Sequence, residues 1–452
     1  MSDTLNIDNL TNKIDRLKNI STLNVDIIDK ISEYITNSED AKLYRINIYN
    51  LANDLNENWQ DVLKHILYAT KEGIFTLNWD VHCPHCNGVT LESDSLLRAN
   101  HESYCDFCKL KFDVAFDESV EVSFTVHEGI KELKINAACI IVPQEEILYQ
   151  NLIEIGTELS FELELDAGSY NFYCPLNPAL GDLYVSEEGS DDLQEFDIEQ
   201  LEGKFNPASI AIGKGKLKIN MANKTEKPVG IFIVKKESLT PTVDIHNKRL
   251  TGLLMATIPD FKELFETEYL SKNENLKVKN LSVMFTDIKG STSLYEMLGD
   301  AKAYNIVREH FNILFDTIHK HNGGIVKTIG DAVMAVFIKA SDSVQCAYEV
   351  HKAFEEYNKP NNIEEAVIVK IGVNEGSCIV VNLNNSIDYF GTTVNKAARI
   401  QNLSKGGDIL LSESIFTDPA VKKVLLNNGT TKAKMIKTTL RGLSGSYNIY
   451  AI

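Results

Sequence analysis

The chain has 452 residues, of which 44% are hydrophobic and 24% are charged, which predicts a globular protein of two or three domains. Its formal net charge of −19 argues against general binding to nucleic acids and against docking on an anionic membrane surface. The start of the chain has no apolar signal segment, and apolar runs such as 137–142 are too short to cross a bilayer. We therefore expect a cytoplasmic protein that does not bind membranes.

Apolar periodicity predicts helices over residues 1–80. Within this segment, residues 47–73 have the pattern of a helix-turn-helix or winged-helix unit. The stretch that would form its recognition helix, residues 57–70, is nearly neutral. This charge balance favours a structural or protein-contact module over a DNA reader.

Four cysteines form a paired cluster in residues 81–112. Cys83 and Cys86 make one C-x2-C pair, and Cys105 and Cys108 make a second pair after 18 intervening residues, in a chain of eight cysteines. Two such knuckles supply the four corners of a tetrahedral zinc site, which predicts a zinc ribbon. Because four thiolates leave no open position, the zinc would be structural rather than catalytic. A pair of disulfides or a knuckle without metal is the alternative.

Residues 113–245 alternate apolar and polar positions with period two, which predicts an antiparallel β-sandwich. We expect the acidic run at 187–203 to be a solvated loop within it. Residues 246–275 then form a helical linker, in which Pro259 suits the first position of a helix.

The segment 276–452 alternates strands and helices in the order βαββαβ, which predicts a ferredoxin-like domain in a multidomain α+β chain. Its long helix over residues 300–324 is expected to bury one apolar stripe against the sheet. The residues of that stripe are Tyr304, Val307, Phe311, Leu314 and Ile318.

Two carboxylates of this domain are expected to meet at one edge of the sheet. Asp287 ends a buried strand, and Asp331 lies at the turn of the hairpin "VKTIGDAVMAVF". Adjacent carboxylates repel unless a cation lies between them, and oxygen ligands suit Mg²⁺ or Mn²⁺. The turn at 288–291 can direct backbone N–H groups at the phosphates of a substrate. On this reasoning the edge is a candidate phosphoryl-transfer site, although both acids have common structural explanations.

A second group of polar residues follows in the chain. Asn395 and Arg399 are four residues apart and therefore share one helix face, and Asp388 comes just before that helix. A permanently charged Arg suits a fixed oxyanion, but Arg399 alone could equally pair with a surface acid.

Four stretches together identify a resemblance for residues 276–452. "FTDIKGST", "VKTIGDAVMAVF", "DYFGTTVNKAARI" and "LRGLSGSYNIY" resemble, in order and spacing, the class III nucleotidyl cyclase catalytic domain. The cysteine pairs and the β segment resemble the uncharacterised region that precedes some bacterial cyclases of this class.

The resemblance implies a metal-dependent cyclisation. Asp287 and Asp331 match the two metal-binding aspartates of the family, and Ile288 would bind the second ion through its carbonyl group. Two Mg²⁺ or Mn²⁺ ions per active site would then assist the attack of the ribose 3′-oxygen on the α-phosphate of the nucleotide.

The remaining family residues imply how the nucleotide is held. Lys327 and Asp388 match the purine-reading pair of adenylate cyclases, whereas guanylate cyclases usually carry Glu and a small polar residue there. Asn395 matches the residue that holds the ribose, and Arg399 the one that stabilises the α-phosphate. Arg441 lies where the family often has a triphosphate-binding lysine, a change that keeps the charge but not the geometry.

These roles predict an adenylate cyclase that converts ATP to cyclic AMP and pyrophosphate at sites shared across a homodimer. The N-terminal half would then be regulatory, with an unidentified ligand or protein partner. There are two alternatives. The protein could be a guanylate cyclase, or it could be a zinc-dependent binding protein whose C-terminal domain senses a nucleotide without converting it.

Overall fold

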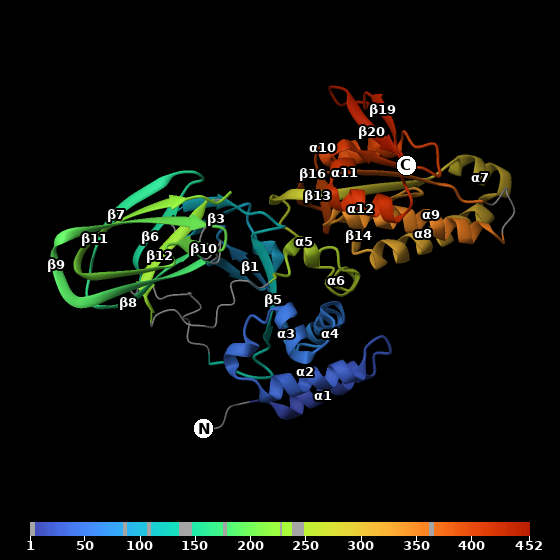
Figure 1. The fold of residues 1–452 in the computed structure, drawn as a ribbon. Helices are drawn as coiled ribbons and strands as arrows, with labels where there is room; N and C mark the ends of the chain where they lie inside the picture. The colour runs from blue at the N-terminus through green and yellow to red at the C-terminus, as the bar shows by residue number, and fades with distance from the viewer. Residues whose placement is uncertain are drawn as a thin grey trace. The chain divides into compact units, whose positions relative to one another are not determined.

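The structure is a computed structural model that describes residues 5–84, 88–105, 110–134, 147–174, 179–226, 228–236, 248–360 and 366–452. Contacts group the chain into two compact units (Figure 1). Unit 1 comprises residues 1–94, 102–114 and 121–250, and unit 2 comprises residues 95–101, 115–120 and 251–452. The five segments expected from the sequence stay a prediction, because contacts alone do not divide the units further.

Unit 1 begins with a group of short helices. They are α1 (Ile7–Lys18), α2 (Val25–Asn37), the 3₁₀ turn η1 (Asp40–Leu43), α3 (Ile48–Leu55) and α4 (Trp59–Lys71). Each α-helix starts after an asparagine whose side chain accepts a backbone N–H of the first turn, which satisfies a donor that the helix itself leaves unpaired. Whether α3 and α4 act as a winged-helix unit stays a prediction.

A three-stranded sheet follows these helices, in the order β2 (Val89–Ser93), β1 (Phe75–His82), β5 (Val120–Val126). β3 (Glu102–Cys105) and β4 (Leu110–Asp113) form a separate hairpin, and η2 (Leu96–Arg98) lies between β2 and β3. The alternating sequence pattern predicted β5 as a strand of the β-sandwich, and this prediction was wrong. Its partner is β1, to which the buried Asp80 also links it by accepting a 2.8 Å hydrogen bond from Ser123.

The β domain is a seven-stranded sheet with the path β6-β12-β8-β9-β11-β7, and β10 pairs with β9. Its strands are β6 (Ile147–Ile153), β7 (Glu158–Leu165), β8 (Gly168–Cys174), β9 (Ala179–Leu201), β10 (Lys204–Asn206), β11 (Ser209–Asn223) and β12 (Val229–Lys235). β9 and β11 pair in parallel, so the purely antiparallel prediction was wrong at this pair.

The acidic run at 187–203 lies mostly within β9 rather than in a loop, which corrects the expectation from sequence. The reason lies in the neighbouring strand. Glu195 accepts hydrogen bonds from Lys218 and Asn220 of β11 at 2.7 and 2.9 Å, so cross-strand pairing compensates the acidic charge.

The C-terminal sheet of unit 2 has the order β14-β15-β13-β16-β18-β20-β19, and β17 pairs with β16. Its strands are β13 (Asn275–Ile288), β14 (Gly323–Ile329), β15 (Ala332–Phe337), β16 (Val369–Leu383), β17 (Ser386–Phe390), β18 (Ile409–Ser412), β19 (Lys434–Thr438) and β20 (Tyr447–Ala451). The first four strands, with α8 and α9, follow the expected βαββαβ order.

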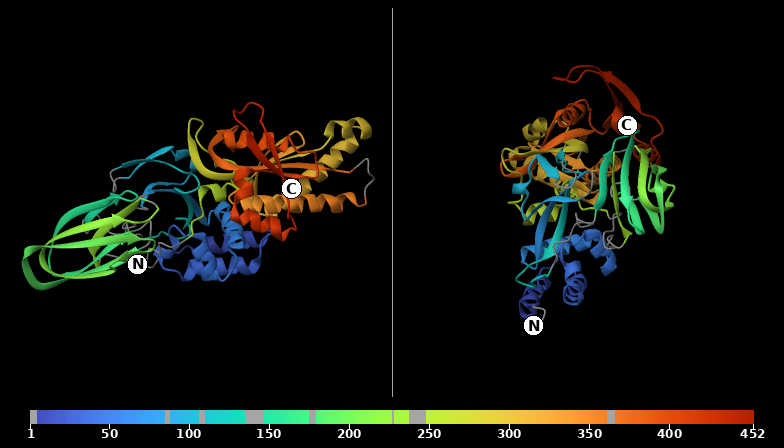
Figure 2. Two further views of the ribbon diagram at one scale, coloured as in Figure 1. Left: turned by 45° about the horizontal axis from the view of Figure 1, so that its top comes forward. Right: turned by 90° about the vertical axis from the view of Figure 1, so that its left-hand side faces the viewer.

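Helices cover both faces of this sheet (Figure 2). They are α7 (Ser291–Leu298), α8 (Asp300–Lys320), α9 (Ala340–Asn358), α10 (Thr392–Gln401), α11 (Glu413–Thr417) and α12 (Pro419–Asn427), preceded in the chain by α5 (Gly252–Met255) and α6 (Pro259–Leu264). One core lies between the sheet and α8, α9 and α12. A smaller core on Leu410 holds Ile400 of α10.

The buried stripe of α8 differs from the expected one. Val307, Leu314 and Ile318 are buried as expected, but the Tyr304 side chain is 60% exposed, and His310 is fully buried instead. The apolar pattern alone predicts the buried face of a helix only to within about one position. Here the face that packs against the sheet includes His310 and leaves out Tyr304.

Two short segments of the N-terminal half fold as part of unit 2. Phe116 donates its backbone N–H to Lys277 of β13 at 2.8 Å and accepts from Leu253 of α5 at 3.1 Å. Its ring is fully buried against Gly252, where a Cβ would lie only 2.5 Å from the ring. Residues 115–120 therefore belong structurally to the unit that carries the cyclase-like sequence.

We expect Phe116→Ala to destabilise unit 2 by about 3–5 kcal/mol, because it empties a site filled by a buried aromatic ring. Hydrogen exchange of full-length protein, followed by mass spectrometry, would show faster exchange in β13 and β16. The matched variant Phe124→Ala, whose buried ring belongs to unit 1, should instead loosen β1. Faster exchange confined to unit 1 in Phe116→Ala would contradict this assignment.

Candidate active site

The two predicted carboxylates meet at the end of the sheet. β13 and β15 are antiparallel, with Thr286 opposite Val333, so the end of β13 lies beside the β14–β15 turn. There the backbone N–H of Ile288 donates to Asp331 Oδ2 at 3.3 Å. The structure thus brings Asp287, Ile288 and Asp331 together as the sequence predicted.

The order of residues in that turn has a conformational reason. Ile329 pairs with Ala332, so Gly330 and Asp331 form a two-residue hairpin loop. Gly330 has φ +64°, and glycine at the first central position is the signature of a type II′ turn, whose twist suits a hairpin. The second central position is then available for Asp331.

The pair carries an excess of negative charge. Burial and the neighbouring Asp331 charge raise the pKa of Asp287, while Lys370 acts in the opposite direction. Lys370 Nζ lies 3.3 Å and Gln401 Nε2 3.4 Å from Asp287 Oδ2. One partly exposed lysine does not neutralise two carboxylates, so the site suits a further cation.

The oxygen donors present fit magnesium or manganese, which both suit carboxylate, carbonyl and water ligands. Among the residues that the structure describes, no group of three or more His, Cys, Asp or Glu side chains is placed to hold a metal. Two carboxylates with ligands from a backbone carbonyl, water and substrate phosphates are a common arrangement for Mg²⁺.

His310 contacts the backbone of this turn, and no role was predicted for it from the sequence. Its Nε2 lies 3.2 Å from the backbone oxygen of Asp331. Burial lowers the pKa of His310 to about 4, so the ring is neutral at physiological pH and can donate to that oxygen. The available sequence signal was its position three residues after Val307 and four residues before Leu314, which places His310 on the same helix face as these two residues.

Lys327 and Asp388 form a second group. Lys327 Nζ lies 2.5 Å from Asp388 Oδ2, and Asp388 Oδ1 accepts the backbone N–H of Tyr389 at 2.8 Å. The Asp388 side chain is only 5% exposed, whereas that of Lys327 is 35% exposed. Among the described residues, no hydrogen bond or ion pair joins this group to Asp287 or Asp331.

Asn395 and Arg399 are both exposed on one face of α10. Arg399 Nε donates to the backbone oxygen of Arg441 at 3.2 Å, so Arg441 lies next to this face. The helix is docked closely on β16: Asn374 donates to the carbonyl of Thr393 at 2.9 Å. At Gly372, a Cβ would lie 2.2 Å from the backbone nitrogen of Gln401, so only glycine permits this approach.

The four predicted zinc ligands are placed only in part. Cys83 and Cys105 are buried, whereas Cys86 and Cys108 lie outside the described residues. Cys83 donates its N–H to the carbonyl of Gly88 at 2.8 Å, and Cys105 of β3 pairs with Leu110 of β4.

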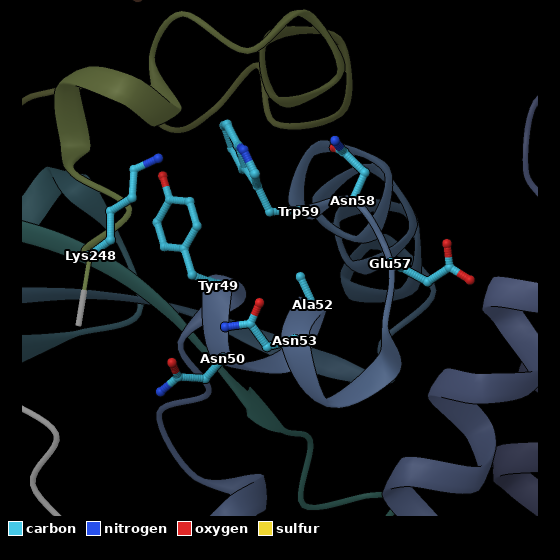
Figure 3. Close-up of a pocket in the computed structure, with 8 residues that line it drawn as sticks. All are labelled: Tyr49, Asn50, Ala52, Asn53, Glu57, Asn58, Trp59 and Lys248. Carbon is cyan, nitrogen blue, oxygen red and sulfur yellow. The ribbon is translucent and has the colours of Figure 1, made fainter. Parts of the chain in front are cut away.

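A cavity of about 440 Å³ lies in unit 1 (Figure 3). The ammonium group of Lys248 lies 4.4 Å from the ring centre of Tyr49 and 5.3 Å from that of Trp59, and three asparagines, Ala52 and Glu57 complete the lining. None of the predicted catalytic residues lines it, so it is separate from the carboxylate site.

Sequence comparison finds a family match in each half of the chain. Residues 274–451 match the adenylate and guanylate cyclase catalytic domain family. This segment belongs to that family. Residues 7–164 match a family of unknown function (DUF5939), and nothing in that match shows a zinc ribbon.

Curated relatives and solved structures are similar to the same cyclase segment. An adenylate cyclase of Anabaena cylindrica is 26% identical over 186 residues, covering 36% of this chain and 37% of the relative. One of Lachancea kluyveri is 30% identical over 166 residues, covering 32% of this chain and 9% of the relative. The chain thus spans well under half of either relative.

Two solved structures are similar at lower identity. The adenylyl cyclase CyaB from P. aeruginosa is 23% identical, with a TM-score of 0.33, covering 39% of this chain and 95% of that chain. The guanylyl cyclase Cya2 is 20% identical, with a TM-score of 0.33, covering 39% and 91%. No described helix is both long and apolar enough to span a membrane.

We expect Gly372→Ala to displace α10, because the added methyl group meets backbone rather than a mobile side chain. Overpacking of this kind costs about 1–3 kcal/mol, and hydrogen exchange in α10 should accelerate. Gly168→Ala in β8 meets only ordinary contacts and serves as the control. Unchanged exchange in α10 of Gly372→Ala would contradict the docking argument.

Proposed function

We propose that the protein is an adenylate cyclase that forms cyclic AMP and pyrophosphate from ATP. The family match supports nucleotide cyclisation, and the Lys327–Asp388 pair at 2.5 Å carries the choice of adenine. Adenine presents an acceptor at N1 and a donor amino group at C6, which complement an ammonium and a carboxylate. Guanine presents the opposite pattern and would leave these groups unpaired.

Asp287 and Asp331, with the Ile288 carbonyl, would hold two Mg²⁺ or Mn²⁺ ions. Bound ions would lower the pKa of the ribose 3′-hydroxyl and offset the charge of the triphosphate. The crowding of the two carboxylates supports this role. In the reaction the 3′-oxygen forms a bond to the α-phosphorus, its proton leaves, and the bond to pyrophosphate breaks.

The exposed face of α10 would hold the sugar and the reacting phosphate. Asn395 would position the ribose, and Arg399 would stabilise the charge that develops on the α-phosphate. Arg441 lies beside Arg399 and would bind the rest of the triphosphate.

We further propose a homodimer in which each active site takes its aspartates from one protomer and its purine pair and α10 face from the other. Exposed apolar side chains flank these groups: Ile329 precedes the turn of Asp331 and is 52% exposed, and Phe390 follows Asp388 and is 44% exposed. Apolar side chains gathered at a functional site are typical of an interface.

The N-terminal half would regulate this activity in response to an unidentified ligand or protein. Its zinc ribbon is supported by the buried Cys83 and Cys105 at corresponding positions of two hairpins. A 2.8 Å hydrogen bond between Thr90 and Ser103 joins these hairpins, as a shared structural Zn²⁺ would require.

We expect the purified protein to form cyclic AMP and pyrophosphate from ATP with Mg²⁺ or Mn²⁺, and little product from GTP. Asp331→Ala should reduce the rate by a factor on the order of 1,000 through loss of metal binding. Chromatographic analysis of the products measures both the preference for ATP over GTP and the loss of rate in Asp331→Ala. Glu296→Ala, which removes an exposed acid of α7, is the control.

A separate double variant tests the choice between ATP and GTP. Lys327→Glu combined with Asp388→Cys should shift the ratio of ATP to GTP turnover toward GTP. An unchanged ratio would contradict purine reading by this pair. Nucleotide binding without any product would favour the sensor alternative.

A further inference from the structure

Lys262 of α6 reaches the strand that carries Lys327. Its ammonium group donates a hydrogen bond to the backbone oxygen of Ile325 in β14. The side chain is partly buried, and burial lowers the pKa of Lys262 to about 8, while the charge of Asp388 acts to raise it. A cation from the linker therefore binds the strand that carries Lys327, and its charge interacts with that of Asp388 within one unit.

The hydrogen bond falls on an irregularity of β14. Ile325 pairs with Ala335 and Lys327 with Met334, so Val326 is an extra residue in the β14–β15 ladder. A β-bulge of this kind changes the direction of the side chains that follow it. The bulge thus sets the direction of the Lys327 side chain. Lys262 binds the carbonyl of Ile325, the residue at which the bulge begins.

The linker is held against β14, which carries Lys327, and against β16, which pairs with the strand of Asp388. At Gly324, a Cβ would lie 2.7 Å from Thr257 Cα, so the linker backbone packs directly on β14. Farther along, the carbonyl of Leu270 accepts from Asn382 of β16 at 2.7 Å, and Asn382 pairs with Ile387, next to Asp388. The linker position is therefore tied to both Lys327 and Asp388.

The charge of Asp388 gives Lys262 a second role. Without substrate, Lys327 pairs with this nearly buried carboxylate. In the proposed complex with adenine, Lys327 would turn to ring nitrogen N1, and the amino group from which Asp388 would then accept is neutral. A buried carboxylate without a cation is unfavourable, and Lys262 is placed to supply one.

From this geometry we propose that Lys262 is a positioning residue for adenine recognition, which holds the β14 bulge and compensates Asp388 while substrate is bound. The inference rests on the proposed adenylate cyclase function. It also assigns the linker a part in substrate selection rather than in connection alone.

Lys262→Met, which keeps an unbranched apolar side chain but removes the charge, tests this role. We expect the KM for ATP to rise and the preference for ATP over GTP to fall, each roughly tenfold, with a smaller change in kcat. Lys262→Arg should recover part of the preference. Lys272→Met, an exposed lysine of the same linker, should behave as the unchanged protein.

Wild-type values of KM and ATP preference in Lys262→Met, with cyclic AMP still formed, would overturn this inference alone. If the unchanged protein forms no product, equilibrium dialysis with ATP and GTP replaces turnover, and an unchanged binding preference in Lys262→Met again overturns it. Should Lys262→Met not fold, Lys262→Gln keeps a donor for Ile325 without the charge and is expected to lose the same preference.

Discussion

The repulsion between Asp287 and Asp331 is the constraint on which the catalytic unit depends. The pairing of β13 with β15 and β16 forces the two carboxylates to one end of the sheet, where burial and mutual repulsion raise the pKa of Asp287. Lys370 compensates this only in part. The fold therefore maintains an unfavourable arrangement at the place where the proposed reaction needs a high affinity for cations.

The purine pair shows the opposite electrostatic design. Lys327 and Asp388 neutralise each other directly, so this group is stable without a ligand, and in the proposed reaction ATP would replace the contact with its own hydrogen bonds. The linker cation Lys262 would, on our proposal, make that exchange easier. The linker and residues 115–120 fold with the C-terminal unit.

The sequence predicted the βαββαβ order and the meeting of Asp287 with Asp331 because the signals are local. The strand before Asp287, the Gly-Asp turn and the i, i+4 spacing of Asn395 and Arg399 are each visible within a few residues. His310 and Lys262 were missed because their roles arise from contacts across 21 and 63 positions of the chain. The errors at β5 and in the acidic run share one cause, since both segments are defined by a strand partner far away in sequence.

Sharing of the active site between protomers is the central claim, and mixing two inactive variants tests it most directly. Asp331→Ala loses the metal half, and Arg399→Ala loses the phosphate half, of a proposed site. After dissociation and reassociation of an equal mixture, half of the dimers would be mixed and each would hold one intact site, so roughly a quarter of the unmutated activity should return. No recovered activity, with both variants folded and dimeric, would show that each protomer holds a complete site and would contradict the account.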